Sequence, residues 1–269
     1  MTAPLPVPAL RAPASASIRR QRGYSLIELS VAILIALFLI GGVLVVEQGV
    51  HRTYQDNSGV GQLQDEQRFA MSLLTEIIAR SGYYPDPTAN TLNTALPSET
   101  TTTPSGAAVT LATGQFLSGI NSGGTPQDAI FVRYMTSSGQ NITLCDGTTN
   151  TTGASHSYTN YLYLTSDASG SYLNCELEQD GAWSPNTEQL VSGLHDMQIM
   201  YGVHTTGSGN DVDTYMTATA VGAANDWPNV TAVQVTLTFL NPLYGKPGAK
   251  QYVTFTRVIS VMSRVGAHS

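Results

Sequence analysis

The sequence predicts an α+β protein in which a long N-terminal helix, part transmembrane and part amphipathic, packs on an antiparallel β-sheet domain. Two patterns support this prediction. An apolar, uncharged run is followed by apolar residues at helical spacing up to about Arg80, and beyond residue 129 apolar and polar residues alternate. The sequence has no alternating strand and helix units and no repeats of solenoid length, which disfavours a doubly wound enzyme fold.

The composition is typical of an exported protein. The 269 residues are 42% hydrophobic, enough for one domain and an anchor, and only 12% are charged. Ser, Thr, Gly and Asn crowd the second half, as in secreted β-rich domains. The net charge of −7 does not suit strong nonspecific nucleic-acid binding, which needs clustered Lys and Arg. DNA binding would require a local basic patch.

The uncharged apolar run covers Leu29–Val46. A helix needs about 20 apolar residues to cross a bilayer, and this run with its apolar neighbours is long enough. Arg19, Arg20 and Arg22 precede it, and clustered basic residues stay on the cytoplasmic side. The sequence therefore predicts a single-pass membrane protein whose body lies outside the cytoplasm.

Two ordinary explanations of this run are incomplete. A cleaved secretory signal would end in a small-x-small site, but Glu47-Gln48-Gly49 follows the run. A plain signal anchor explains the length and the orientation, but not Glu28, because a charge at membrane depth costs about 3 kcal/mol unless it is paired. An acid that snorkels to the interface is the alternative for Glu28, and Glu47 is interpreted as an ordinary interfacial residue.

The eight residues Arg22-Gly23-Tyr24-Ser25-Leu26-Ile27-Glu28-Leu29 resemble the leader junction of type IV pilins and type II secretion pseudopilins. The resemblance implies that a membrane-embedded prepilin peptidase cuts after Gly23 and methylates the new N-terminus at Tyr24. It also makes Glu28 the fifth-position glutamate of the mature chain. Tyr24 and Ser25 depart from the usual phenylalanine and threonine but keep an aromatic ring and a small hydroxyl.

The resemblance implies a role for Glu28 in subunit assembly. Cleavage would leave a positive amine four residues away, and in a filament the carboxylate can pair with the amine of a neighbouring subunit. That pairing offsets the membrane cost and sets the axial register.

The helical pattern continues beyond the membrane. Glu76 and Arg80 form an i,i+4 pair, and Ser81–Pro87 contains the Gly and Pro residues that end a helix. Glycines weaken the middle, each by about 1 kcal/mol relative to Ala, so we expect one interrupted helix from about Tyr24 to about Arg80. The glycines are Gly41, Gly42, Gly49, Gly59 and Gly61, and the apolar face comprises Val60, Leu63, Ala70, Leu74 and Ile77.

The segment Thr88–Thr125 is rich in Thr, Ser, Asn, Gly and Pro, so it is interpreted as an irregular surface connection. We expect a leader peptide at 1–23, the helix at 24–80, a Ser/Thr/Gly-rich connecting loop at 81–128 and a periplasmic antiparallel β domain at 129–269.

Alternation in the β domain predicts half-buried strands. Asp167–Gly170 is interpreted as a hairpin turn, and Arg257 interrupts the last apolar face, which indicates a strand end, a bulge or a buried partner for an acid. The segments Leu194–Gly202 and Arg264–Gly266 resemble the PilW family of minor pilins. The inward series are Ile130, Val132, Tyr134; Leu162, Leu164; Leu173, Cys175, Leu177; Met197, Ile199, Tyr201, Val203; Val233, Val235, Leu237, Phe239; and Val253, Phe255, Ile259, Val261.

The two cysteines, Cys145 and Cys175, are expected to form a disulfide, because the body is predicted to be periplasmic and oxidising. Two buried free thiols are the alternative. A zinc site is not expected, because no histidine stands at ligand spacing from the two cysteines. We therefore expect no metal and no cofactor.

The sequence carries no Gly-x-Ser-x-Gly elbow, His-Glu-x-x-His pair or phosphate loop, so we predict no enzyme activity. His195 shares strand parity with Met197 and is interpreted as a core or edge histidine. Asn210, Asp211 and Asp213, in the 207–213 loop, have oxygen ligands that suit calcium, but a solvated turn explains them better.

The sequence and the resemblance together predict a PilW-like minor type IV pilin that is cut by prepilin peptidase and takes part in initiating or capping pilus assembly. Its expected partners are other minor pilins, the major pilin and the bacterial inner membrane. One alternative is a large pseudopilin of a type II secretion system. Another is an anchored periplasmic binding or adhesion module, with the Thr88–Thr125 segment or the Tyr-rich strand ends as its contact.

Overall fold

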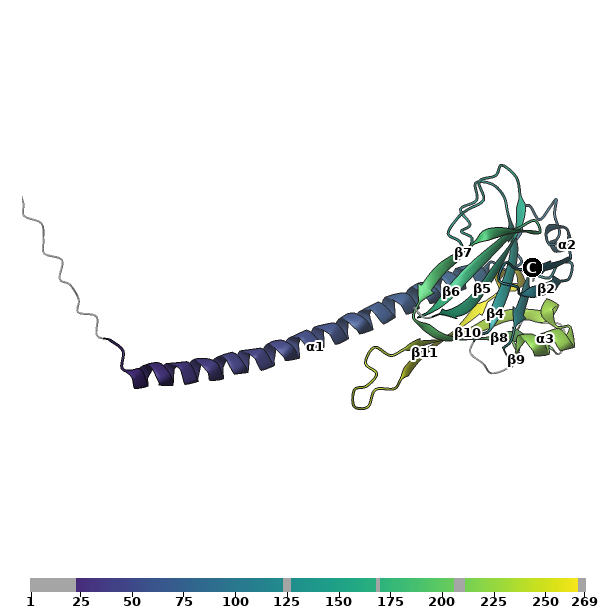
Figure 1. The fold of residues 1–269 in the computed structure, drawn as a ribbon. Coiled ribbons are helices and arrows are strands. Elements are labelled where there is room, and N and C mark those ends of the chain that lie inside the picture. Colours follow the sequence, from purple (N-terminus) through teal and green to yellow (C-terminus); the bar gives the residue numbers. More distant parts are fainter. Residues whose placement is uncertain (1–22, 123–126, 168–169, 206–210, 266–269) are drawn as a thin grey trace, which may run out of the picture. The chain divides into compact units, whose positions relative to one another are not determined.

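The computed structural model describes residues 23–122, 127–167, 170–205 and 211–265 (Figure 1). The expected leader therefore lies outside the described residues, except for Gly23. The chain divides into two compact units, Met1–Tyr54 and Gln55–Ser269, and each is described by itself. The helices are α1 (Leu26–Ala79), α2 (Leu92–Ala95), α3 (Ala218–Ala224) and α4 (Met262–Val265), with a 3₁₀ turn η1 (Trp227–Asn229).

The strands are β1 (Glu99–Thr102), β2 (Ala108–Leu111), β3 (Leu117–Ile120), β4 (Ala129–Thr136), β5 (His156–Asp167), β6 (Gly170–Gln179), β7 (Ala182–Ser192), β8 (Leu194–Val203), β9 (Thr214–Met216), β10 (Val230–Leu240) and β11 (Tyr252–Ser260). They form three antiparallel sheets: β3-β4-β5-β6-β7, β11-β10-β8-β9 and the small sheet β1-β2. The expected antiparallel domain is confirmed, with its strands divided between sheets rather than joined in one.

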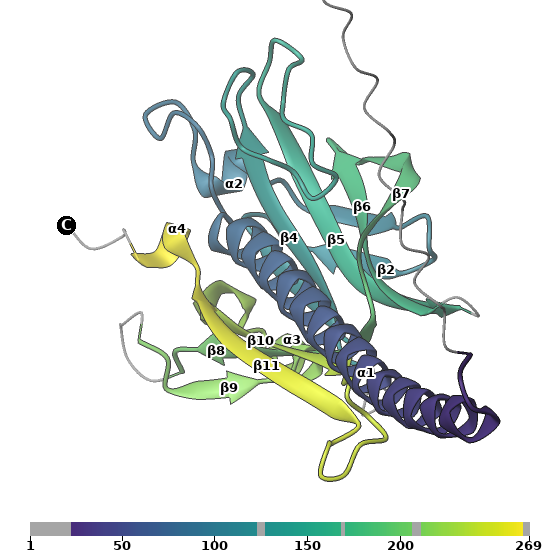
Figure 2. The same cartoon turned by 90° about the vertical axis from the view of Figure 1, so that its left-hand side faces the viewer.

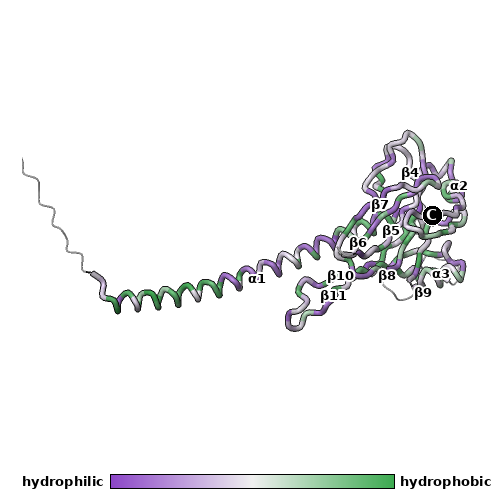
Figure 3. Tube along the Cα trace, in the orientation of Figure 1, coloured by the Kyte–Doolittle hydropathy of each residue, from purple (hydrophilic) through white to green (hydrophobic). Residues whose placement is uncertain are grey.

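Helix α1 is assigned without a break from Leu26 to Ala79, so the expected interruption is wrong. Glycine weakens a helix by about 1 kcal/mol but keeps every backbone hydrogen bond of the ladder available, and the long helix tolerates several such positions. A Cβ atom on Gly41, Gly42, Gly49 or Gly61 would meet nothing within 4 Å. Figure 3 shows that the first half of α1 is apolar and the second half more polar.

The end of α1 is where the sequence predicts it. The Ser81 hydroxyl donates to the Ile78 carbonyl at 2.7 Å, and Gly82 follows with a φ of 73°, a conformation that glycine adopts without strain. The Gly82 N–H donates to the Arg133 carbonyl at 2.9 Å, which ties the helix end to β4. The predicted pair is also present, with Glu76 Oε1 and Arg80 Nη2 2.8 Å apart.

The expectation of an irregular connection at Thr88–Thr125 is wrong for much of that segment. It contains α2, capped by the Thr91 hydroxyl, and the three short strands β1, β2 and β3. Each strand has only four residues, too few for an alternating pattern to stand out in a Thr-rich stretch. Pairing with distant residues defines them, as when Leu117 in β3 pairs with Val132 in β4.

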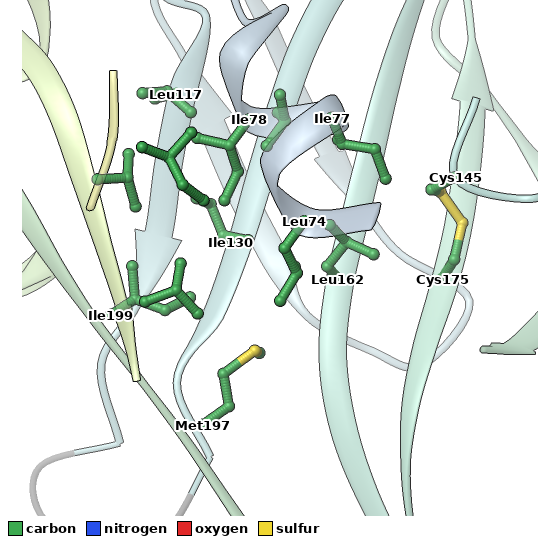
Figure 4. Packing of buried hydrophobic residues seen from close by; sticks show 14 of the residues in the cluster. Leu74, Ile77, Ile78, Leu117, Ile130, Cys145, Leu162, Cys175, Met197 and Ile199 are labelled. Carbon is green, nitrogen blue, oxygen red and sulfur yellow. A yellow bond between two sulfur atoms is a disulfide. The ribbon is translucent and has the colours of Figure 1, made fainter. Parts of the chain in front are cut away.

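The core of the second unit lies between the domain half of α1 and the two larger sheets (Figure 2). In Figure 4, Leu74, Ile77 and Ile78 of α1 lie among side chains from both sheets. Leu74 and Ile78 are fully buried and Ile77 is 1% exposed. The predicted inward series of β4, β8 and β10 all belong to this core, which confirms their parity.

The β1–β2 hairpin covers the second face of the five-stranded sheet, which the sequence predicts to face solvent. Val109 and Leu111 of the hairpin cluster with Phe131 and Tyr161 of the sheet. As a result β4 is buried on both faces, and its Arg133 is 1% exposed. The half-buried interpretation of β4 and β6 is therefore wrong, because a distant hairpin supplies the missing cover.

The interpretation of Arg257 is also wrong. Arg257 lies within β11, in unbroken register with Val235 of β10, and its side chain is exposed. It marks neither a strand end nor a bulge, and it is not buried. Its Nη1 donates to the Thr75 hydroxyl of α1 at 3.1 Å, so the long side chain links the edge strand to the helix.

Candidate functional site

The segment before α1 contains the predicted cleavage bond. Gly23, Tyr24 and Ser25 precede the helix, which begins at Leu26, and the Leu29 N–H donates to the Ser25 carbonyl at 3.1 Å. Tyr24 is 85% exposed. The Gly23–Tyr24 bond therefore lies in non-helical, exposed backbone, the conformation in which peptide bonds are cut most readily. Cleavage and methylation at this bond stay predictions.

Glu28 lies in the first turn of α1. A carboxylate at this place is stabilised by the partial positive charge of the helix N-terminus, typically by 0.3–1 kcal/mol in the exposed case. Its side chain is exposed, as are those of Leu26 and Leu29 around it. The role of this exposed carboxylate in subunit assembly stays a prediction.

The apolar part of α1 is long enough and apolar enough to cross a membrane once. Within the described residues, none of this apolar stretch is buried. Apolar side chains gain about 25 cal/mol per Å² when they leave water, so a surface of this kind needs lipid or other helices around it. At its far end Glu47 Oε1 lies 3.8 Å from His51 Nε2, one helical turn away. That exposed pair fits the interfacial interpretation of Glu47.

The expected disulfide joins Cys145 and Cys175, whose Cα atoms are 5.9 Å apart (Figure 4). Both residues are 1% exposed, and the Cys145 N–H donates to Asn160 Oδ1 at 2.9 Å. Cys175 belongs to β6 and Cys145 to the loop after β4. The bond therefore attaches that loop to the core of the five-stranded sheet.

The parity argument for His195 is wrong. His195 is exposed and stacks on Tyr252, with ring centroids 4.1 Å apart. The register between β8 and β10 shifts between Asp196 and Leu194, so alternation does not carry through to His195. An irregularity of this kind reverses which side chains face the core. The edge interpretation of His195 holds, and the core one does not.

Only part of the 207–213 loop is described, and Asn210 lies outside the described residues. Asp213 accepts hydrogen bonds from the N–H and the hydroxyl of Thr205, at 2.8 and 3.0 Å. His204 Nδ1 lies 3.4 Å from Asp211 Oδ1. The acidic side chains in the described part of the loop thus contact residues of the same loop. The described residues contain no group of three or more His, Cys, Asp or Glu suited to a metal ion.

A buried charged cluster beneath the β1–β2 hairpin was not predicted. Arg133 Nη2 lies 3.4 Å from Glu99 Oε2, with side chains 2% and 15% exposed, and Glu178 of β6 interacts with Glu99. Beside them, buried Glu176 accepts hydrogen bonds from Tyr163 Oη at 2.8 Å and from Ser105 Oγ at 3.1 Å. The signal was the presence of Arg133, Glu176 and Glu178 on strands, but alternation placed them towards solvent.

Two family models match parts of this chain, one in the strands of the body and one at the start of α1. The family model described as "Type IV Pilus-assembly protein W" matches residues 161–259, which extend from within β5 to within β11. The model described as "Prokaryotic N-terminal methylation motif" matches residues 18–44, which include the Gly23–Tyr24 bond, Glu28 and most of the apolar run. The search of curated proteins finds no match.

The two matches fall on different parts of one chain, and each agrees with an independent feature of it. The methylation motif covers the exposed apolar start of α1, and the other match covers β-strands of the body. A methylation motif implies processing by prepilin peptidase, and a pilus-assembly subunit acts with other pilins. Residues 161–259 are thus similar to the family of type IV pilus-assembly protein W, a family of structural subunits rather than enzymes, and residues 18–44 are similar to the N-terminal methylation motif of prepilins.

Proposed function

We propose that this protein is a minor pilin that takes part in initiating or capping the pilus, after prepilin peptidase has cut between Gly23 and Tyr24 and methylated Tyr24. Its expected partners are other minor pilins and the major pilin, and its body lies in the periplasm before assembly. The proposal also includes a leader peptide at 1–23 and a helix at 24–80, followed by a body in which segment 81–128 contributes α2 and strands β1 to β3 to the domain at 129–269.

The observation that carries the proposal is the exposed apolar surface of α1 beginning directly after the methylation site. In the bilayer this surface is covered by lipid. A subunit that leaves the bilayer needs an equivalent cover, and the apolar helices of other subunits provide it. An anchored enzyme or binding module has no need to place a cleavable junction before its anchor.

Glu28 supports the filament interpretation on energetic grounds. A charged carboxylate at membrane depth costs about 3 kcal/mol. Cleavage before Tyr24 would create a positive amine within one helical turn, and a neighbouring subunit would bring a second amine of the same kind. A pair between Glu28 and that amine removes most of the cost and favours one axial position of the helices.

The size and sheet content of the body support a position at the end of the pilus rather than one repeated along its length. Strands β3 to β11 build the two larger sheets, and the β1–β2 hairpin covers one of them. A repeated subunit must pack against identical copies along the whole filament. A single copy at an end needs such contacts on one side only, which leaves room for a large body.

The test is the N-terminal sequence and intact mass of the membrane-purified protein, expressed with and without a prepilin peptidase. We expect a start at N-methylated Tyr24 only when the peptidase is present. An uncut N-terminus in both samples would remove the filament interpretation and leave an anchored periplasmic module.

A second measurement separates the pilus from the secretion filament. In the source bacterium, deletion of the gene is expected to reduce the number of surface pili strongly while type II secretion continues. Loss of secretion with normal piliation would instead favour a large pseudopilin. Normal piliation and secretion with lost adhesion would favour the binding module.

A further inference from the structure

The β1–β2 hairpin lies over one face of the five-stranded sheet and is held there by a small set of contacts. Val109 and Leu111 make the apolar contact with the sheet. Trp183 Nε1 of β7 donates to Thr101 Oγ1 of β1 at 2.7 Å. Two four-residue strands with this little core form a weak unit by themselves, since isolated hairpins are marginally stable in water.

Beneath the hairpin lies a stack of aromatic rings. The rings of Phe131 and Tyr161 are stacked with centroids 4.3 Å apart, and those of Tyr161 and Tyr163 with centroids 4.6 Å apart. Phe131 is fully buried and Tyr161 is 4% exposed. If the hairpin detaches from the sheet, this stack loses its cover.

The charged cluster next to the stack has an excess of acid. Glu99 comes from the hairpin, whereas Arg133 and Glu178 come from β4 and β6 of the sheet. Arg133 Nη2 lies 3.4 Å from Glu99 Oε2, and Glu178 Oε1 accepts from the Gly181 N–H at 2.5 Å. With both carboxyl groups ionised, one guanidinium faces two negative charges in a buried place.

Each of the two carboxylates has one oxygen without a donor. Within the described part of the chain, Glu99 Oε1 and Glu178 Oε2 are buried and have no hydrogen-bond partner. An ionised carboxylate can only accept hydrogen bonds, so neither Glu99 nor Glu178 can donate a hydrogen bond to the other when both are ionised. Their two negative charges also repel each other. A single proton on Glu99 changes both facts, because the carboxyl group then donates to Glu178 and the cluster becomes neutral.

We propose that the β1–β2 hairpin is a pH-sensitive lid over the aromatic stack, held closed by one proton shared between the carboxyl groups of Glu99 and Glu178. The proton connects the hairpin to the sheet, and its loss leaves two like charges facing each other across the contact.

The electrostatics give the direction of the pH dependence. Burial, followed by the interaction with Glu178, raises the pKa of Glu99 from its ordinary value of 4.5 to about 7, while Arg133 acts in the opposite direction. Glu178 and Arg133 are the charged groups that act on Glu99 from the strands beneath it. A detached hairpin returns Glu99 to water and to its ordinary pKa, so the closed form binds the proton more tightly.

Linkage converts this difference into a change in lid opening. The closed form is most stable below pH 4.5, loses stability as the pH rises from 4.5 to about 7, and changes little further above that range. Between pH 6 and pH 8 the equilibrium constant for opening should rise about tenfold.

The experiment is hydrogen–deuterium exchange of the full chain in detergent micelles at pH 6 and pH 8. Exchange is expressed as protection factors, which remove the pH dependence of the intrinsic rate. We expect protection of the β1 and β2 amides to fall about tenfold from pH 6 to pH 8, while protection of the β10 amides stays constant.

Two variants separate the shared proton from other effects of pH. In Glu99→Gln the amide donates to Glu178 without titrating, so the hairpin should keep the same protection at both pH values. Glu178→Gln should act likewise, because its amide donates to Glu99. The control is Glu188→Gln, an exposed carboxyl on β7 outside the cluster, which should keep the tenfold fall.

Equal protection of the wild-type hairpin at pH 6 and pH 8 would overturn the proposal. It would also be overturned if the fall persisted in both Gln variants. A loss of protection in β10 of the Glu99→Gln variant would mean that this variant has unfolded. The test would then rest on the pH dependence of the wild-type protein and of the Glu178→Gln variant.

Discussion

Pro242, in the loop between β10 and β11, lies directly against Gly59 of α1, so that a Cβ atom on Gly59 would approach the Cβ of Pro242 to 3.0 Å. From the same loop Lys246 forms an ion pair with Asp56, about one helical turn earlier. The sequence suggests that glycines in this stretch weaken the helix, whereas the structure gives Gly59 a packing role. Gly61, two residues later, has no such neighbour.

These two glycines should respond differently to the same change. Gly61→Ala is expected to stabilise the second unit by about 1 kcal/mol, because alanine favours the helix and its Cβ meets nothing within 4 Å. Gly59→Ala should gain clearly less, since the same propensity is offset by crowding against Pro242. Denaturant unfolding in micelles measures both, and equal gains would show that the Pro242 contact does not constrain the helix.

The core contact of α1 predicts a large difference between two apolar residues of the same helix. Leu74→Ala should destabilise the fold by about 2–5 kcal/mol, because the side chain is fully buried among residues of both sheets. Phe69→Ala is the matched control, since Phe69 is 53% exposed, and it should change stability by less than about 0.5 kcal/mol. Similar losses for the two variants in denaturant unfolding would contradict this packing of α1.

The disulfide should contribute to the stability of the body. Cys145 and Cys175 are 30 residues apart in sequence, and closing a loop of that length stabilises by roughly 3–4 kcal/mol on the chain-entropy model. The Cys145→Ala, Cys175→Ala double variant should lose about that amount in denaturant unfolding. A reducing agent should destabilise the wild type and leave the double variant unchanged, and a wild type that ignores the reductant would refute the prediction.

The proposed assembly role predicts that the two acids bounding the apolar run differ in importance. Glu28→Gln should reduce the number of pili at least tenfold, because it leaves the amine of the neighbouring subunit without its partner at membrane depth, where an unpaired charge costs about 3 kcal/mol. Cleavage at Gly23 should continue, since the junction itself is unchanged. Glu47→Gln, whose carboxylate pairs with His51 in its own helix, should change piliation less than about twofold.

Electron microscopy counts the pili, and N-terminal sequencing checks the cleavage. Normal piliation with Glu28→Gln would mean that Glu28 is an interfacial acid with no part in subunit pairing. A loss of pili with both variants would indicate a general defect of membrane insertion instead.

The elements predicted best are those whose pattern is local. The uncharged run and the helical spacing up to Arg80 predict α1, and alternation predicts β4, β8 and β10. In each case the side chains that repeat along the sequence also share one face of the element, so neighbouring residues carry enough information. The Asp167–Gly170 hairpin belongs with them, because β5 and β6 pair across it, although residues 168–169 are outside the described part.

In the candidate site, too, the features with a local sequence pattern were predicted and the others were not. The cleavage junction and Glu28 are motifs of consecutive residues and need no fold to be found. The parity of His195 fails because an irregularity in β8 reverses the alternation, and the sequence carries no clear mark of it. Arg257 fails for a related reason, because a long side chain on an edge strand reaches the helix without being buried.

By itself the sequence determined the apolar N-terminal helix, the methylation motif, the alternating strands and an even pair of cysteines, because each depends on the order of nearby residues or on composition. Only the tertiary structure decided that the Thr-rich segment folds into the β1–β2 hairpin and covers the outer face of the sheet. That contact buries Arg133 with Glu99 and Glu178, residues far apart in sequence. Burial and mutual charge, rather than residue type, turn an ordinary glutamate into a group that titrates near neutral pH.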